Sequence, residues 1–305
     1  MVDQASIKQQ AMSYDVPDGK GYLHRIFCRE DGEPVLLVHG SLENGRIFYT
    51  ERGKGLAPFL AEKGFDTYTM DWRGKGRSTP AIRRGHRYGQ TEFIKEDLER
   101  VFEAIKAKRG QYPICVVGHS WGGVLLSSFL LRHPKFLGVV KGMVYFGTKR
   151  RISVKSWKRF VGIELVWRLL GNLLCTVFGY FNTKVIRLGV EGDTTRFFRQ
   201  ITFWVKNNPW VDPDDGFSYE AAANDLQLPP TLYLTGAGDQ YLGNPIDVQR
   251  FIDESGLHEY EFHVCGLENG YQVDYGHVDL LTHTKAREEV YPMVSDWFRQ
   301  YLGKS

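Results

Sequence analysis

The sequence predicts an α/β fold with a mostly parallel sheet, and three observations support this prediction. Short apolar runs alternate along the chain with longer stretches that carry apolar residues at helical spacing. The runs end in Gly and turn residues, as is typical of strands buried on both faces of a parallel sheet. Hydrophobic residues make up 42% and charged residues 25% of the 305 positions. This is the composition of a globular protein, and it excludes a disordered, collagen-like or coiled-coil chain.

The candidate strands are five apolar runs. They span residues 34–38, 65–71, 114–117, 139–146 and 231–235. The first run ends in His39-Gly40, the second in Asp71 and the third in Gly118-His119-Ser120. Strands that alternate with helices in this way are joined by right-handed crossovers.

The candidate helices are residues 91–105, 244–255 and 284–302. The first has apolar residues at helical spacing, and Thr91 is its predicted N-cap because a threonine oxygen can accept from the free N–H groups of the first turn. The six apolar positions are Phe93, Ile94, Leu98, Val101, Phe102 and Ile105.

One segment interrupts the alternation of strands and helices. From Lys149 to Trp210 the chain has 12 Lys and Arg but only 3 Asp and Glu, a local charge of +9, whereas the whole chain carries +3. The segment holds four of the seven Trp. Its uncharged stretch, residues 169–181, is shorter than the ~20 residues of a membrane span and indicates a buried or interfacial helix. We interpret residues 149–227 as a helical insertion, and residues 1–148 and 228–305 as the core domain.

The strongest chemical motif is Gly118-His119-Ser120-Trp121-Gly122, which has the form G-x-S-x-G. It follows an apolar strand and precedes a helix-like run, the context that a nucleophile elbow requires. A serine on such a turn needs a strained backbone, and the flanking glycines remove Cβ atoms that would clash. Ser120 is therefore the candidate nucleophile.

A neutral serine needs a base, and the base needs an orienting carboxylate. Asp239 follows an apolar strand and a Gly-rich turn, and His277 lies in a loop before the last helix. The chain order Ser, Asp, His fits the elbow motif. Asp239 and His277 are therefore the predicted acid and base. The weaker alternatives are His258, His263 and His283 as the base, and Asp247, Asp253 and Asp274 as the acid.

The oxyanion that forms on an attacked carbonyl needs preorganised donors, and backbone N–H groups are the simplest source. One predicted donor is the N–H of Trp121, directly after the nucleophile. The second is the N–H of Ser41, in the turn after the first long strand, with Leu42 as the alternative.

Together these motifs resemble those of α/β-hydrolases. The order of His39-Gly40, the turn at 71–78, the elbow at 118–122, Asp239 and His277 is that of the family, and the resemblance covers residues 20–303. It implies an α/β-hydrolase fold: a mostly parallel eight-stranded sheet with helices on both faces and a helical cap inserted after strand six. The turn at 71–78 lacks the G-x-x-x-x-G-K-[ST] spacing of a phosphate loop. The resemblance implies that this turn is structural. The Tyr-Gly-His ending at 275–277 resembles esterase and lipase branches.

The expected activity is that of a serine hydrolase that cleaves lipid-like carboxylic esters through an acyl-enzyme on Ser120. The apolar, Trp-rich cap suits an acyl chain, and its basic residues suit an anionic head group or membrane surface. Leu42, Trp167 and Trp204 are the expected substrate-binding residues. Two alternatives stay open: a thioesterase, acyltransferase or peptidase of the same fold, and a non-catalytic binding protein of hydrolase fold.

The composition also guides expectations about partners and location. With 39 Lys and Arg against 36 Asp and Glu, the chain is not built to bind nucleic acid. The nine His show no ligand spacing, so we expect no metal, and no cofactor is implied. The four Cys form no CxxC pair, and we expect buried free thiols. Residues 1–20 lack the apolar core of a secretory signal, so we expect a cytoplasmic protein that contacts anionic membrane peripherally through its cap. The sequence leaves the oligomeric state open.

Overall fold

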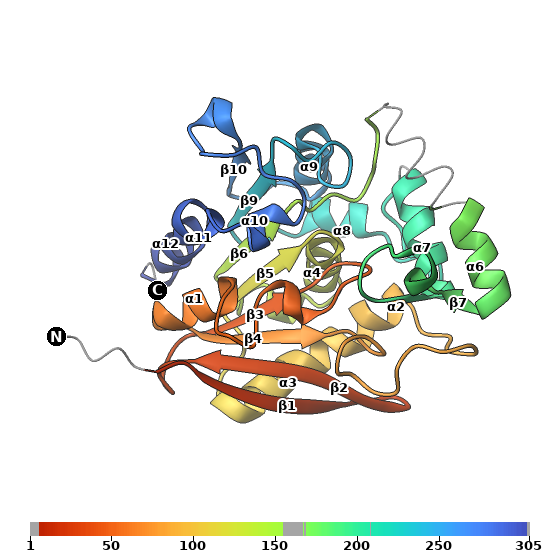
Figure 1. Ribbon diagram of the computed structural model, residues 1–305, viewed down its shortest axis with the longest axis horizontal. Helices are drawn as coiled ribbons and strands as arrows, with labels where there is room; N and C mark the ends of the chain where they lie inside the picture. Colours follow the sequence, from red (N-terminus) through yellow and green to blue (C-terminus); the bar gives the residue numbers. More distant parts are fainter. Residues whose placement is uncertain (1–5, 155–166, 168, 208, 304–305) are drawn as a thin grey trace.

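The computed structural model describes residues 6–154, 167, 169–207 and 209–303 (Figure 1). Its centre is an eight-stranded sheet in the order β1-β2-β4-β3-β5-β6-β9-β10. Strand β2 runs antiparallel to both of its neighbours, and all the other pairs are parallel. The strands are β1 Lys8–Val16, β2 Gly19–Phe27, β3 Pro34–Val38, β4 Asp66–Asp71, β5 Cys115–His119, β6 Gly142–Phe146, β9 Thr231–Gly236 and β10 Tyr260–Cys265.

All five predicted strands are confirmed, as β3, β4, β5, β6 and β9. The sheet also contains three strands that the apolar runs do not indicate. Strands β1 and β10 are its edges, and most of their side chains are exposed or half-buried. Neighbouring elements cover an edge strand less than a central strand. Fewer of its side chains are buried, so its sequence lacks the continuous apolar run of a central strand.

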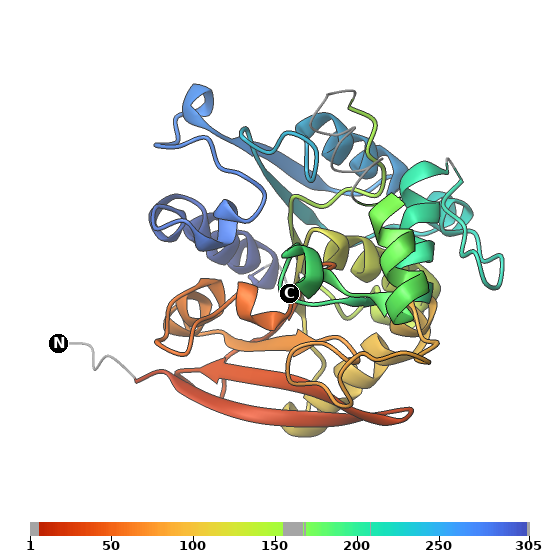
Figure 2. The same cartoon turned by 45° about the vertical axis from the view of Figure 1, so that its right-hand side comes forward.

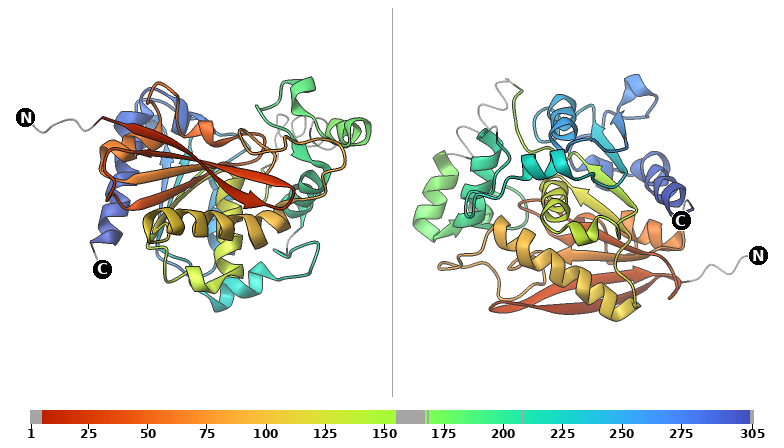
Figure 3. Two further views of the ribbon diagram at one scale, coloured as in Figure 1. Left: turned by 90° about the horizontal axis from the view of Figure 1, so that it is seen from below. Right: turned by 180° about the vertical axis from the view of Figure 1, so that it is seen from behind.

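Helices cover both faces of the sheet (Figures 1 and 3). The pleat sends alternate side chains to opposite faces. In β3, Leu36 and Val38 join one hydrophobic core, whereas Val35 and Leu37 join the other. The first core packs against α3 Leu98–Arg109, α4 Trp121–Arg132, α8 Tyr219–Asp225 and α9 Pro245–Glu254. The second packs against α1 Leu56–Glu62, α10 Asp279–Thr282, α11 Ala286–Glu289 and α12 Tyr291–Leu302.

The predicted helix at 91–105 forms, but its start differs from the prediction. Helix α2 (Gln90–Glu92) continues through a π-helical turn, Phe93–Asp97, into α3. Thr91 is not the N-cap, because the cap residue is Gly89, whose backbone N–H donates to Glu92 at 2.7 Å. The Thr91 hydroxyl instead donates to Asp212 at 2.9 Å.

The predicted helix at 284–302 is divided in two. Helix α11 ends at Glu289 and α12 begins at Tyr291. Pro292 explains the division, since proline lacks an N–H and its ring clashes with the carbonyl four residues earlier in a continuous helix. Proline is tolerated in the first turn of α12, where it lies.

Between β6 and β9 the chain leaves the sheet and forms a separate group of elements, of which α6, α7 and β7 lie together to one side of the core (Figures 1 and 2). These elements are α6 Gly171–Phe178, β7 Tyr180–Phe181, η5 Thr183–Ile186, β8 Asp193–Thr194 and α7 Thr195–Lys206. Helix α7 also contributes side chains to the first core, and α8, which follows it before β9, packs in that core. The predicted helix in the uncharged stretch is α6. Residues 155–166, 168 and 208 of the predicted cap lie outside the described residues. Among the helices that the structure describes, none has the length and apolarity needed to cross a bilayer.

Candidate active site

Ser120 lies on the sharp turn between β5 and α4 that the G-x-S-x-G motif predicts. Its backbone has a φ of 51° and a ψ of −121°, an unfavourable conformation for a residue with a Cβ, of the kind found where a fold imposes strain at a functional site. Its N–H donates to the Phe146 carbonyl of the next strand at 2.8 Å. The glycines allow this close packing, since a Cβ at Gly122 would lie 2.3 Å from the Val38 oxygen.

Asp239 and His277 lie together at the ends of their elements. Asp239 follows β9, and its Oδ2 is 2.6 Å from His277 Nδ1. The other oxygen of the carboxylate accepts from the Leu242 N–H at 3.0 Å. Asp239 is not a helix cap, because Asn244 caps α9. An aspartate bound to Nδ1 leaves Nε2 of the imidazole for proton transfer.

The loop that carries His277 packs against the turn that carries Ser120. His119, the residue before Ser120, has Nε2 3.2 Å from the His277 carbonyl oxygen, and the two imidazole centroids are 4.9 Å apart. Gly147, next to the Phe146 carbonyl that binds Ser120 N–H, would place a Cβ 2.9 Å from the His277 ring. Ser120 and His277 therefore adjoin the same short stretch after β6. A hydrogen bond between Ser120 Oγ and His277 Nε2 stays a prediction.

Burial sets the charge state of the pair. It lowers the pKa of His277 below its ordinary value, although the hydrogen bond and charge of Asp239 act in the opposite direction. Burial tends to raise the pKa of Asp239, but the hydrogen bond and charge of His277 outweigh it, so the pKa of Asp239 lies below its usual value. Near neutral pH the pair is thus a carboxylate and a neutral imidazole, the state that a general base requires.

The turn after β3 lies against Ser120, the candidate nucleophile, as the predicted oxyanion hole requires. A Cβ at Gly40 would lie only 3.0 Å from the Cβ of Ser120. Leu42 has a φ of 60°, which gives the turn its sharp bend. Trp121 is the first residue of α4, so its N–H has no partner within the helix. The role of the Ser41 and Trp121 N–H groups as oxyanion donors stays a prediction.

A partly buried carboxylate in this turn, Glu43, is not among the residues that the sequence predicts for the site. Glu43 Oε1 accepts from the Gly40 N–H and lies 2.6 Å from His119 Nδ1. Attraction between the two side chains lowers the pKa of Glu43 and raises that of His119, even though burial opposes both shifts. The pair thus joins the turn after β3 to the residue before Ser120. The sequence signal for this contact is a glutamate three positions after Gly40. Its partner, His119, is 76 residues away in the chain, so the sequence alone does not indicate the pair.

The segment around β8 holds the same turn from its other side. The Val190 and Glu191 N–H groups donate to the Leu42 carbonyl at 2.9 and 3.1 Å. The Ser41 hydroxyl donates to Asp193 at 2.7 Å, and Asp193 also forms a buried ion pair with Lys75 at 2.5 Å. The inserted elements therefore contact the predicted oxyanion turn directly.

The three predicted substrate-binding residues lie in different surroundings. Leu42 is half-buried and packs with Trp167 on a small apolar cluster of the inserted segment. Trp167 stacks near Phe181 and Phe198. Trp204 is fully buried, and its indole N–H donates to the Val211 carbonyl at 2.6 Å. Trp204 is thus a packing residue of the core, and contact of any of the three with substrate stays a prediction.

The alternative acids and bases have other partners. His258 bonds to Tyr233 and the Gly256 carbonyl, His263 to Glu261, and His283 accepts from the Lys285 N–H. Asp247 accepts from Ser153, Asp253 from Gln249, and Asp274 from the Leu267 N–H. Each of these contacts has a local structural role.

Two further aspartates, Asp71 and Asp279, fix loops that adjoin the site. Asp71 accepts from the Gly45 and Arg77 N–H groups at 2.7 and 2.8 Å, which agrees with a structural role for the turn at 71–78. Asp279 accepts from the Gly276 N–H at 2.8 Å and so fixes the loop just before His277.

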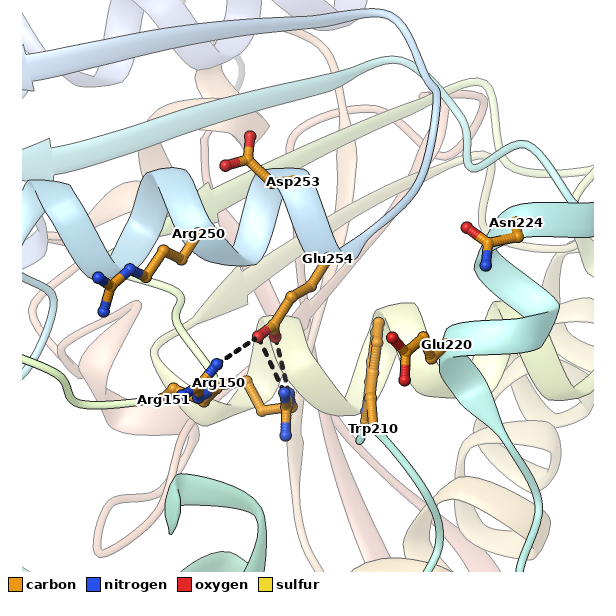
Figure 4. Close-up of a pocket in the computed structure, with 8 residues that line it drawn as sticks. All are labelled: Arg150, Arg151, Trp210, Glu220, Asn224, Arg250, Asp253 and Glu254. Carbon is orange, nitrogen blue, oxygen red and sulfur yellow. Dashed lines mark hydrogen bonds and ion pairs between the residues drawn. The ribbon is translucent and has the colours of Figure 1, made fainter. Parts of the chain in front are cut away.

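A separate polar pocket of 350 Å³ lies between α8 and α9 (Figure 4). None of the three candidate catalytic residues lines it. Its lining residues are Arg150, Arg151, Trp210, Glu220, Asn224, Arg250, Asp253 and Glu254. Arg150 and Glu254 form a two-point ion pair there, at 2.8 and 2.9 Å. Most of the charged side chains of this pocket therefore have partners within the protein.

Comparison with known proteins gives relatives that share this architecture. A polymerase subunit for poly(3-hydroxyalkanoate), PhaC of Haloferax mediterranei, is 19% identical over 303 residues; the match covers 88% of this chain and 58% of that protein. The chain thus spans little more than half the length of this curated relative. The carboxylesterase CesB of Bacillus subtilis superposes with a TM-score of 0.58 at 20% identity, with 97% of this chain and 94% of that chain covered. The thioesterase domain from the curacin biosynthetic pathway gives a TM-score of 0.56 at 16% identity, with 95% and 98% covered.

The family is shown by a broader match. The sequence profile of the α/β hydrolase fold matches residues 33–264, which run from the residue before β3 to the last strand of the sheet. The matched region includes Ser120 and Asp239. The sheet order, the strained elbow and this match agree, and the chain belongs to the α/β-hydrolase fold family.

Proposed function

We propose that the protein is a serine hydrolase that cleaves carboxylic esters through an acyl-enzyme on Ser120. The observation that carries the proposal is the Asp239–His277 hydrogen bond of 2.6 Å, located beside a serine with a positive φ at the start of α4. A carboxylate, an imidazole and a strained serine in this order are the parts of acyl-transfer catalysis.

The reaction follows from the roles of these groups. His277 takes the proton of the Ser120 hydroxyl as its oxygen attacks the ester carbonyl. The N–H groups of Ser41 and Trp121 bind the oxyanion, and His277 returns the proton to the departing alcohol. Water then gives a proton to His277 and attacks the acyl carbonyl; His277 returns this proton to the Ser120 oxygen as the acyl–oxygen bond breaks and the acid leaves.

The test is covalent labelling of Ser120. We expect a fluorophosphonate probe to label the wild-type protein at Ser120, and we expect Ser120→Ala to abolish labelling and lower kcat on 4-nitrophenyl esters roughly 10⁴-fold or more. Ser13→Ala is the matched control, because Ser13 is an exposed residue of β1. Labelling that persists in the Ser120→Ala protein would refute the proposal.

We further propose that the esters are lipid-like and are reached at an anionic membrane surface. The support is an exposed apolar stripe on the inserted segment: Leu169, Leu173 and Val177 are 69%, 57% and 54% exposed and are spaced four residues apart, with Leu173 and Val177 in α6 and Leu169 in the turn just before it. The exposed Lys184 and Arg187 of the η5 region flank it in sequence. Apolar residues beside cations are typical of a surface that lies on anionic lipid.

Vesicle binding tests this part of the proposal. Leu173→Glu places a charge in the stripe, and we expect it to weaken binding to phosphatidylglycerol vesicles roughly tenfold, since burial of a leucine contributes about 1.5–3 kcal/mol. Leu257→Glu is the matched control, because Leu257 is 89% exposed but lies between α9 and β10. Equal weakening by both substitutions, or no vesicle binding by the wild type, would contradict a membrane surface on α6.

A further inference from the structure

We infer that Lys149 binds an anionic group of the substrate, a carboxylate or phosphate carried close to the scissile ester. The inference rests on the proposed function, because it assigns a substrate class to the same site. It starts from a lysine that the reaction itself does not require.

Lys149 differs from every other buried Lys or Arg among the described residues. Five such side chains are buried, and Lys149 is 5% exposed. Four have a carboxylate partner: Arg25 pairs with Asp66 at 2.8 Å, Lys75 with Asp193 at 2.5 Å, Arg150 with Glu254 at 2.8 Å, and Arg73 with Asp97. Within the described part of the chain, the ammonium of Lys149 has neither a hydrogen bond nor an ion pair.

The surroundings of Lys149 place it at the catalytic site. Its Nζ lies 6.0 Å from the centre of the ring of Trp121, the residue after the nucleophile. Gly147, two positions before it, packs against the His277 ring. The charge of Lys149 acts on both Asp239 and His277.

The carboxylates that face Lys149 already have closer partners. Asp239 binds His277 and the Leu242 N–H. Asp247 accepts from the Ser153 N–H at 3.0 Å and from its hydroxyl at 2.5 Å. Both carboxylates attract the ammonium from a distance, but neither contacts it.

A buried ammonium without a contacting anion is costly, because burial removes water and no carboxylate replaces it. Burial accordingly lowers the pKa of Lys149. The positive charge also disfavours the imidazolium form of His277, which must arise during the reaction. An anion on the substrate would supply the missing partner of Lys149 and remove this repulsion. Both effects favour esters that carry a negative charge.

Paired esters test the inference. In each pair one member carries an anion and the other is neutral: mono-4-nitrophenyl adipate with 4-nitrophenyl hexanoate, and 4-acetoxybenzoate with its methyl ester. The first pair puts a carboxylate on the acyl side and the second on the alcohol side; 4-acetoxyphenyl phosphate extends the alcohol side to phosphate. We expect the wild type to favour at least one anionic ester in kcat/KM.

Three variants separate charge from packing. Lys149→Met keeps the length of the side chain without the charge, and we expect it to lower the ratio of anionic to neutral kcat/KM roughly tenfold or more, the size of a charge-assisted hydrogen bond. Lys149→Arg keeps the charge, and we expect it to retain most of the preference. Lys141→Met, at an exposed position before β6, is the control and keeps the wild-type ratio.

A merely structural lysine would give a different result. If Lys149→Met lowers kcat/KM equally for both members of every pair, or if the wild type favours no anionic ester, the inference is wrong. Calorimetric binding of monomethyl adipate and phenyl phosphate to the wild type and Lys149→Met decides the question independently of turnover. Failure of Ser120 labelling would refute the proposed function, whereas equal affinity of the two proteins for these anions would refute only the anion site.

Discussion

The imidazole of His277 has one aspartate on its Nδ1 and little water around it. These two conditions shift its pKa in opposite directions. Its side chain is 12% exposed and that of Asp239 is 4% exposed. Burial disfavours the imidazolium, and the carboxylate favours it. Because burial has the larger effect, the pKa of His277 lies below its ordinary value of about 6.5.

This balance predicts how ester hydrolysis depends on pH. Only the neutral imidazole can accept a proton, so we expect the acid limb of kcat/KM to have its midpoint below pH 6.5. Asp239→Asn removes the contribution that raises the pKa of His277, and the acid limb should move to still lower pH. We expect kcat to fall roughly 10⁴-fold in the same variant, because the tautomer and orientation of the imidazole are no longer fixed. A pH–rate profile of both proteins checks this, and an acid limb that does not move would contradict the assigned pair.

The pair of buried His119 and partly buried Glu43 leads to a second prediction, on stability. The pKa of Glu43 is lowered, so its contribution is present above its unfolded pKa and is lost as the pH falls through the folded value. The pKa of His119 is raised, so its contribution is complete below its unfolded pKa and is lost as the pH rises through the folded value. The charged pair therefore stabilises the fold most at mildly acid pH.

We expect Glu43→Gln to cost about 3 kcal/mol of unfolding free energy near pH 6, because breaking a buried pair leaves a charge without a partner. The loss should be smaller at pH 9, because the contribution of the His119 charge decreases as the pH rises through its folded pKa. Urea unfolding at the two pH values measures both numbers. Glu261→Gln is the control, since Glu261 pairs with His263 on the exposed side of β10. An equal loss at both pH values for Glu43→Gln would show that the His119 charge has no part in it.

Between the elements, the contact with most consequence joins β8 to the turn after β3. Asp193 has two bonds that serve different purposes: the Ser41 hydroxyl ties the inserted segment to the predicted oxyanion turn, and Lys75 ties it to the turn after β4. Both Lys75 and Asp193 are 1% exposed. Removing one member of such a pair is far more costly than replacing both with apolar residues.

Substitutions at this contact test it directly. We expect Asp193→Asn to lower the unfolding free energy by about 3 kcal/mol or more, because Lys75 is left buried without an anion. The double variant Asp193→Leu with Lys75→Met should recover most of that loss, since neither charge remains. The double variant should have a lower kcat than the wild type, because leucine cannot accept from the Ser41 hydroxyl, whereas the amide oxygen of the Asp193→Asn variant still can. Urea unfolding and ester kinetics separate the two effects, and a wild-type kcat in the double variant would exclude a role for β8 in shaping the turn.

Across the whole molecule, the sequence predicts those parts whose cause is local. The runs at 34–38 and 231–235 are strands because both of their faces are buried, and Ser120 is recognisable because its elbow needs glycines within a few residues. The start of α2 at Gly89 and the Glu43–His119 pair depend on contacts with distant residues, and no local pattern marks them.

Lys149 shows the same limit most clearly. In the sequence it is one of 12 cations in a basic segment, which as a whole suggests contact with an anionic head group or membrane surface and does not distinguish Lys149 from the other eleven. In the structure it is buried three residues after the end of β6, and Gly147 of the same stretch packs against the His277 ring. The net charge of a segment therefore predicts what kind of surface it forms, whereas the chemical role of a single charged residue depends on its surroundings in the fold.

The reactivity of the four cysteines reports on the stability of the entire fold. All four are free thiols; Cys115, Cys175 and Cys265 are buried, and Cys28 is partly buried. Burial raises the pKa of Cys265 to about 11 and that of Cys115 well above its ordinary value. Since the thiolate is the reactive form, these thiols should react only when the core opens.

We therefore expect Ellman's reagent at pH 7.5 to titrate no more than the Cys28 thiol in the native protein within minutes, and all four thiols in guanidinium without added reductant. The midpoint of thermal unfolding should be the same with and without dithiothreitol, because no disulfide constrains the unfolded chain. The slow appearance of the buried thiols should follow global unfolding, since Cys115 and Cys265 belong to the core on one face of the sheet and become accessible only when that face separates. Rapid reaction of all four in the native protein would mean that this core opens without unfolding of the sheet.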